Sequence, residues 1–124
     1  MTITPTFLNT LGQSDRSAVL VTWVLTSANA DGAPIELPEF SNFTWQYEAT
    51  WGGATLTLQG SNSGAGYFPL TKVNTAGTAA TATADGGTAT NEICRYVRPN
   101  LTVVGAGATV TVTLVANRAT PVRT

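Results

Sequence analysis

Hydrophobic and polar residues alternate along most of this chain. Between residues 43 and 50, aromatic residues and alanine occupy every second position, and Thr, Gln and Glu lie between them. Leucine alternates with threonine at 55–58, and valine or leucine alternates with threonine at 108–116. A period of two places one set of side chains on each face of a β-strand. The pattern therefore predicts strands with one apolar and one polar face over these segments.

The segment from Val19 to Thr26 predicts a further strand, because it is rich in β-branched and aromatic residues. Its alternate positions from Val19 to Leu25 are expected in the core. The pair Gly52-Gly53 separates two of the alternating segments, so positions 43–60 are expected to form a β-hairpin. Shorter strands are predicted at 34–37, 66–70, 79–84, 92–98 and 101–104.

The turn signals and the absence of helical patterns define the fold class. Glycine lies beside small polar residues at 30–32, 60–64, 84–87 and 105–107, which is typical of turns. No stretch keeps the 3.6-residue period of an amphipathic helix beyond a turn or two. About eight short strands in one domain predict an all-β fold, an antiparallel β-sandwich that is jelly-roll-like.

The two ends of the chain look different from this core. Residues 1–14 show no clear alternation and are expected to form an extended N-terminal arm, with the β-sandwich domain spanning 15–117. Residues 118–124 are expected to form an extended C-terminal tail, because Pro121 cannot donate to a ladder. The segment 74–90 is almost wholly Thr, Ala, Gly and Asn, a composition that can form a thin strand or a loop but cannot fill a core.

Composition adds expectations about compartment and partners. Cys94 is the single cysteine, so no internal disulfide can form and a reducing compartment is expected. The first residues lack the basic start and apolar run of a signal peptide, and no stretch approaches a membrane helix. Only 10% of the residues are charged and the net charge is −1, which favours association between protein surfaces. One lysine and five scattered arginines disfavour nucleic acid as a partner.

The residues needed for catalysis are largely missing. The chain contains no histidine, which removes the commonest general base and the usual zinc and iron ligands. A glycosidase needs two carboxylates, but Glu48 alone falls mid-strand, on a polar face where it is expected to be solvated. Cys94 is expected to be a small buried hydrophobic residue, and Asp31 and Asp85 stand too isolated to bind calcium. We therefore expect no enzymatic activity, no metal and no cofactor.

The aromatic residues permit one binding alternative. Trp51 and Tyr67 lie beside predicted turns, where they would either pack over the end of the sandwich or form part of a flat sugar-stacking platform. The sequence leaves both possibilities open.

Two stretches of the chain carry a family resemblance. One is residues 54–64, ATLTLQGSNSG, followed by Tyr67-Phe68-Pro69-Leu70, and the other is 94–99, CRYVRP, followed by 110–115, VTVTLV. In their pattern of residues these stretches resemble small proteins of tailed bacteriophages, namely capsid cement or decoration proteins. The resemblance covers about half to two-thirds of the chain. The resemblance implies a jelly-roll-like sandwich on the capsid exterior of a virion, made in the host cytoplasm. It also implies that the protein bridges neighbouring major capsid subunits, self-associates as a dimer or trimer, and has no catalytic residues.

These considerations give a set of expected protein-contact residues. They lie outside the alternating core or beside turns: Phe7, Leu8, Leu11, Trp51, Tyr67, Arg118 and Arg123. Two other functions remain open. One is another structural component of the virion, such as a head-tail connector, tail or fibre piece. The other is a carbohydrate-binding module for host attachment.

Overall fold

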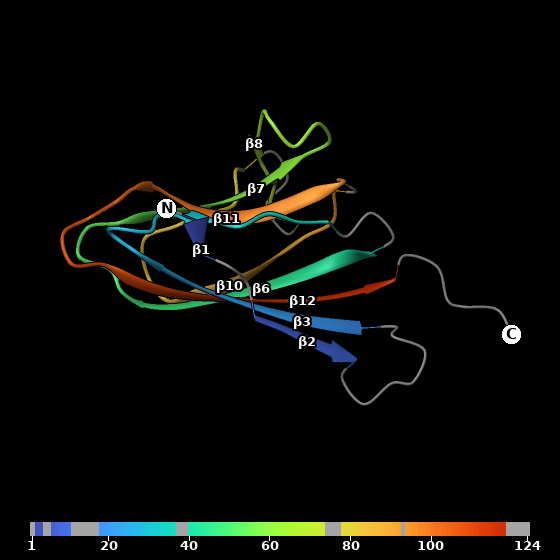
Figure 1. Cartoon of the computed structure of the whole chain (residues 1–124), viewed down its shortest axis with the longest axis horizontal. Helices are drawn as coiled ribbons and strands as arrows, with labels where there is room; N and C mark the ends of the chain where they lie inside the picture. Colours follow the sequence, from blue (N-terminus) through green and yellow to red (C-terminus); the bar gives the residue numbers. More distant parts are fainter. Residues whose placement is uncertain are drawn as a thin grey trace, which may run out of the picture.

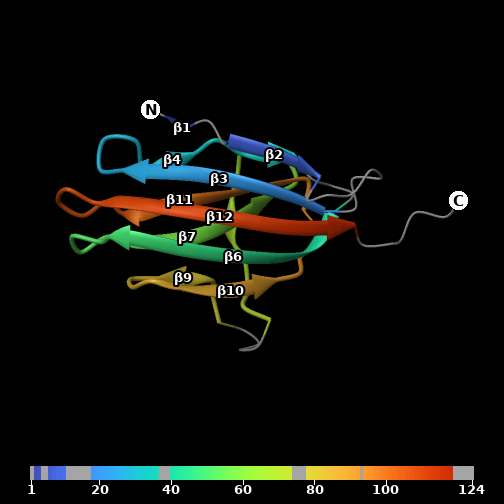
Figure 2. The same cartoon turned by 90° about the horizontal axis from the view of Figure 1, so that it is seen from below.

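The fold consists of two β-sheets packed face to face (Figure 1). The computed structural model describes residues 2–3, 6–10, 18–36, 40–73, 78–92 and 94–118, and these contain no helix. The five-stranded sheet has the order β10-β6-β12-β3-β2 (Figure 2). Its strands are β10 (Gly86–Thr90), β6 (Phe40–Thr50), β12 (Thr109–Arg118), β3 (Ala18–Thr26) and β2 (Thr6–Thr10).

The second sheet has seven strands, several of them very short. Its central path runs β1-β4-β11-β7-β8, with β5 paired to β11 and β9 paired to β7. The strands are β1 (Thr2–Ile3), β4 (Asp31–Gly32), β5 (Ile35–Glu36), β11 (Tyr96–Val103), β7 (Thr55–Ser61), β8 (Phe68–Pro69) and β9 (Thr81–Ala82).

The strand order is that of a jelly roll. Strands β4 and β5 both pair with β11, so together they form one interrupted strand. Strands β8 and β9 both pair with β7 and form another. From β3 onward the chain then alternates between the sheets, apart from the step from β7 to β8, which stays in one sheet. The two sheets of such a fold enclose one core. The all-β, antiparallel, jelly-roll-like sandwich predicted from the alternation is thus confirmed.

The core lies between the sheets and is built on stacked indoles. The rings of Trp23 and Trp45 are 6.0 Å apart at an interplanar angle of 20°, and Phe43 meets Trp45 edge-on at 6.4 Å. Each indole N–H has an acceptor: Trp23 Nε1 donates to the carbonyl of Ala33 at 2.9 Å, and Trp45 Nε1 to Thr90 Oγ1 at 3.0 Å. Large aromatic groups can therefore be buried here without leaving a polar atom unpaired.

The predicted hairpin at 43–60 is wrong. Strand β6 pairs with β10 and β12, whereas β7 pairs with β8, β9 and β11 in the other sheet. The Gly52-Gly53 turn therefore crosses from one sheet to the other. It packs against the β11–β12 turn, where Ala106 N donates to the carbonyl of Gly52 at 3.1 Å. A Cβ at Gly52, whose φ is +55°, would lie 2.2 Å from the carbonyl oxygen of Ala106, so this close approach requires glycine.

Strand β11 passes through Pro99, where the sequence predicts a break between two strands. Pro99 lies opposite Leu58 in the ladder with β7. The N–H and carbonyl of Leu58 are both used on the other side of β7, by Ala80 and Leu70. This pair is therefore one of the antiparallel positions that exchange no hydrogen bonds, so the missing proline N–H removes none from the ladder with β7.

The chain ends and the small-residue segment also differ from the simplest expectation. Within the expected N-terminal arm, residues 6–10 form an edge strand that pairs antiparallel with β3, and residues 2–3 pair with β4. An edge strand has one neighbour in its sheet and can form without a clear alternating pattern. In the segment 74–90, the described residues form β9 and β10, so the thin-strand possibility is the one observed.

Candidate functional site

The outer surface of the five-stranded sheet consists mainly of uncharged side chains. On the five-stranded sheet, threonine, glutamine and valine alternate with the core positions, and we call this surface the threonine face. Its central residues are Thr22, Val24, Thr44, Gln46, Glu48, Thr111, Thr113 and Val115. Among the side chains that the structure describes, two carboxylates border this face, Glu48 on β6 and Asp85 at its β10 edge. Val24 is 42% exposed and Val115 is 37% exposed, so apolar side chains reach solvent there.

A shallow, open depression lies on the threonine face between β6 and the edge strand β10. Its volume is about 610 Å³, and Gly86 and Gly87 contribute no side chain to fill it. Thr44, Gln46 and Glu48 border it on the β6 side. The depression opens the threonine face to solvent along its β10 edge.

Trp51 lies at one end of the sandwich and is half-buried. Its ring meets Tyr47 edge-on at 6.3 Å, and its Nε1 donates to Asp85 Oδ1 at 2.8 Å. The backbone N–H of Ala49 donates to the same carboxylate oxygen at 3.0 Å. Trp51 thus closes the end of the core, which is the packing alternative to a sugar-stacking platform.

Tyr67 lies on the other sheet, under an arginine. The guanidinium carbon of Arg98 is 3.9 Å from the centre of the Tyr67 ring, and Arg98 Nε donates to Gln59 Oε1 at 2.9 Å. The Tyr67 hydroxyl is buried and has no hydrogen-bond partner among the described residues. The face of the Tyr67 ring is therefore covered by a cation, and it is not a free platform for a sugar.

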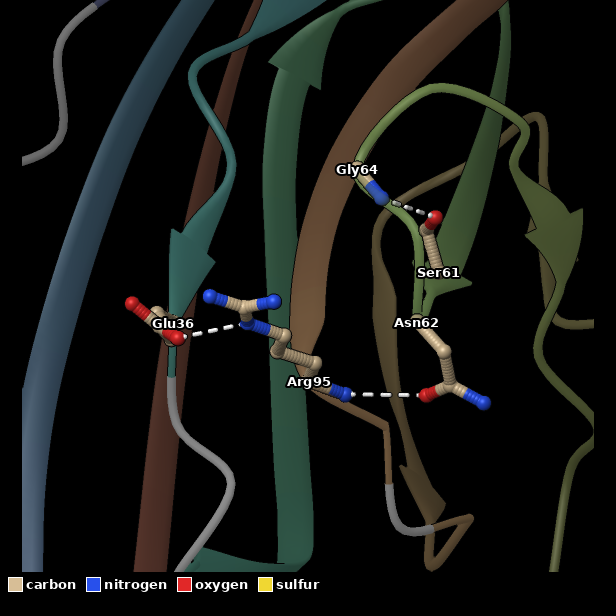
Figure 3. Close-up of polar contacts among 5 residues, drawn as sticks. All are labelled: Glu36, Ser61, Asn62, Gly64 and Arg95. Atoms are coloured by element: carbon tan, nitrogen blue, oxygen red, sulfur yellow. Dashed lines mark hydrogen bonds and ion pairs between the residues drawn. The ribbon is translucent and has the colours of Figure 1, made fainter.

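Beside this pair, a second arginine is held at the end of β11 (Figure 3). Arg95 Nε donates to Glu36 Oε2 at 2.7 Å, and its guanidinium lies 5.1 Å from the centre of the Tyr96 ring. The hydrogen bond to Glu36 raises the pKa of Arg95, so it is charged at any physiological pH. The backbone N–H of Arg95 donates to Asn62 Oδ1 at 3.1 Å, which ties the 61–67 loop to this strand. We call Tyr67, Arg95, Tyr96 and Arg98 the arginine–tyrosine cluster.

The expected contact residues are distributed over three places. In register, Phe7 and Leu8 of β2 lie opposite Val21 and Leu20 of β3. Arg118 ends β12 opposite Phe40, at the same end of the five-stranded sheet as the last residues of β2. Trp51 follows the opposite end of β6, and Tyr67 lies on the other sheet. Leu11 and Arg123 lie outside the described residues.

The remaining reactive group is buried. Cys94 is packed in the core, where burial, with a further contribution from Glu92, raises the pKa of its thiol. Thiolate formation is correspondingly disfavoured. Within the described ranges, no three Cys, Asp or Glu side chains gather as metal ligands, and no helix there is long and apolar enough to cross a membrane.

Comparison with known proteins supports the fold and leaves the function open. No family model matches the chain, and no curated protein sequence matches it. The chain is similar in structure to the SPBc2 prophage-derived protein YomS, with a TM-score of 0.57 and 10% identity over 79% of this chain and 95% of YomS. At this identity the similarity establishes a shared β-sandwich fold.

Two further solved structures are more distant. They are the cupin domain of Schizosaccharomyces pombe Cnp3 and a Bacillus endospore appendage from a family of disulfide-linked pili. For Cnp3 the TM-score is 0.43 with 11% identity, over 92% of this chain and 61% of that one. For the appendage it is 0.39 with 12% identity, over 95% and 91%. At these scores neither structure bears on function.

Proposed function

We propose that this protein is a non-enzymatic structural component of a phage virion that binds the capsid exterior and bridges neighbouring major capsid subunits, as a cement or decoration protein does. The observation that carries the proposal is the threonine face, whose centre consists of threonine, glutamine and two exposed valines, with carboxylates at Glu48 and at Asp85 toward its β10 edge. The family resemblance of the sequence and the fold shared with a prophage-derived protein support the same assignment.

The physical argument concerns desolvation. Burying a charged side chain at an interface is costly unless it is paired, whereas burying valine is favourable and burying threonine requires only a hydrogen-bond partner for its hydroxyl. Protein interfaces are depleted of charged residues at their centre. The centre of the threonine face satisfies this condition, because its two carboxylates, Glu48 and Asp85, lie toward the β10 edge, while the opposite surface carries charges of both signs at Asp31, Glu36, Arg95 and Arg98. We therefore assign the threonine face to the capsid.

The stoichiometry of purified virions provides the first test. Gel densitometry should give a copy number near one per major capsid subunit, or a simple fraction of it. A handful of copies per particle would indicate a tail, fibre or connector component and would overturn the cement assignment. Absence from the particle would overturn the virion assignment altogether.

A matched pair of substitutions tests the surface itself. Thr44→Lys places a charge on the threonine face beside Val115, and Thr81→Lys places the same charge on an exposed strand position of the other sheet. We expect Thr44→Lys to weaken binding to empty heads about tenfold or more, because the lysine must be desolvated. Thr81→Lys should bind as the wild type does. Equal effects of both variants would contradict the assignment of this face.

A further inference from the structure

The arginine–tyrosine cluster contains a half-buried cation with no counter-ion. Arg95 forms an ion pair with Glu36, and it is the one ion pair found among the described residues. Arg95 is exposed, whereas Arg98 is half-buried and its Nε donates to the neutral amide of Gln59. A partly desolvated charge without an opposite charge is unfavourable, so an anion is the group that this position lacks.

The guanidinium of Arg98 is held in a fixed orientation. It stacks on the Tyr67 ring at 3.9 Å and is anchored through Nε, which leaves its two Nη groups without an acceptor in the described part of the chain. A guanidinium fixed in this way presents two parallel N–H donors, which match the two oxygens of a carboxylate or phosphate. Because the side chain is already ordered, little conformational entropy is lost when an anion binds.

The neighbouring groups are also hydrogen-bond donors. Arg95 is engaged with Glu36 through Nε, and neither of its Nη atoms has a hydrogen-bond acceptor among the described residues. Asn62 uses Oδ1 to accept from the backbone of Arg95, so its Nδ2 amide group remains available, and Figure 3 shows it turned away from Arg95. Tyr96, which separates the two arginines in sequence, lies against the loop at Gly64. Arg95, Tyr96 and Asn62 thus lie close together at the start of β11, and Tyr96 is two residues before Arg98 on the same strand.

From this arrangement we propose that the cluster is a binding site for an acidic saccharide, with Arg98 bound to its carboxylate or phosphate group. The neutral amide of Asn62, in the loop that leads to Tyr67, is suited to sugar hydroxyls, which an acidic peptide does not offer. Glu36 neutralises Arg95, so Arg98 is the principal anion ligand. The site lies on the sheet opposite the threonine face and does not depend on the proposed capsid contact.

Isothermal titration calorimetry of the full chain provides the test. The probes are tri-galacturonate, its methyl ester, inorganic phosphate and oligo-glutamate, in buffer of low ionic strength. We expect tri-galacturonate to bind and the uncharged ester to bind at least about tenfold more weakly, because the charge-assisted bonds are lost. Phosphate binding comparable to that of tri-galacturonate would identify phosphorylated sugars as the better source of the anion. Oligo-glutamate binding as tight as tri-galacturonate binding would overturn the saccharide assignment.

Three variants separate the site from general charge effects. Arg98→Gln should abolish measurable binding, and Arg98→Lys should weaken it because lysine lacks the planar pair of donors. Lys72→Gln removes a cation outside the cluster and should leave binding unchanged. Thermal melting checks that each variant folds. Retention of binding in Arg98→Lys and Arg98→Gln, or no anion binding by the wild type, would overturn the proposal and leave Arg98 as a support for the loop.

Discussion

Asp85 and Trp51 are joined by a hydrogen bond of 2.8 Å that fastens the start of β10 to the end of β6. The same carboxylate oxygen accepts the backbone N–H of Ala49 at 3.0 Å. Strand β10 is at the edge of its sheet and is made of Gly, Thr and Ala, so its own side chains contribute little packing. The side chain of Asp85 therefore holds the start of β10 against β6, to which the small side chains of β10 contribute little.

Removing this carboxylate should loosen the edge of the sheet. Asp85→Ala deletes two charge-assisted hydrogen bonds at an exposed site, and we expect a loss of about 1–2 kcal/mol in the free energy of unfolding. Glu48→Ala, an exposed carboxylate one strand away with no such contacts, should change stability by less than about 0.5 kcal/mol. Urea denaturation followed by tryptophan fluorescence measures both. A similar loss in the two variants would argue against the Asp85 contacts as the cause.

The buried bond between Trp45 and Thr90 makes a second prediction. Thr90→Val keeps the shape of the side chain but leaves the indole N–H without an acceptor in the core, so it should destabilise the protein by about 1–3 kcal/mol. Thr90→Ser retains the hydroxyl and should lose less stability than the valine variant. The denaturant midpoints of the two variants compare their stabilities. Equal stabilities would show that the hydroxyl is not needed as an acceptor for the Trp45 indole.

The sequence predicts the core far better than it predicts the connections. The alternate residues from Val19 to Leu25 are buried as expected, because a period of two determines which face of a strand turns inward. The same pattern does not say which strand is its neighbour. A tight glycine turn after residue 50 is compatible with a hairpin or with a crossing between sheets, and only the packing of Gly52 against Ala106 favours the crossing.

For the candidate sites, too, the sequence predicts which face a residue lies on but not which residues are its neighbours. The low charge of the chain predicts an associating surface, and the alternation places Glu48 on a polar face, but the sequence does not show that Asp31, Glu36, Arg95 and Arg98 lie on the opposite sheet. Tyr67 is singled out by its position beside a turn. Its partner Arg98 lies on a distant strand, where nothing in the local pattern indicates the contact. Such pairs depend on strand order, which the alternation leaves undetermined.

The close approach of β7 to Cys94 gives a third prediction. A Cβ at Gly60 would lie 2.6 Å from Cys94 Sγ and 2.9 Å from Leu70 Cδ2. Gly60→Ala should therefore cost about 1–3 kcal/mol through overpacking. Gly66→Ala, where a Cβ meets nothing within 4 Å, is the matched control and should be near neutral. Adding Cys94→Ala to Gly60→Ala should recover part of the loss, and a purely additive double variant would contradict this steric explanation.

The final prediction concerns stability at alkaline pH. Burial raises the pKa of the Cys94 thiol from its ordinary value of 9.0 and that of the Tyr47 hydroxyl from 10.0. The folded protein then retains protons that the unfolded chain releases. The associated stability is fully present below the unfolded pKa values and is lost as the pH rises through the higher folded ones.

Urea midpoints measured between pH 7 and 11 should therefore decline above about pH 9. The Cys94→Ala variant leaves a small cavity and should be less stable throughout, so the comparison is between slopes. Its decline between pH 8 and 10 should be shallower than that of the wild type, because the thiol no longer titrates. In the folded wild type the thiol should also react slowly with a disulfide reagent at pH 8 and rapidly in denaturing urea. Parallel pH profiles together with fast labelling of the folded protein would show that Cys94 is accessible, contrary to its buried position against Gly60 and Leu70.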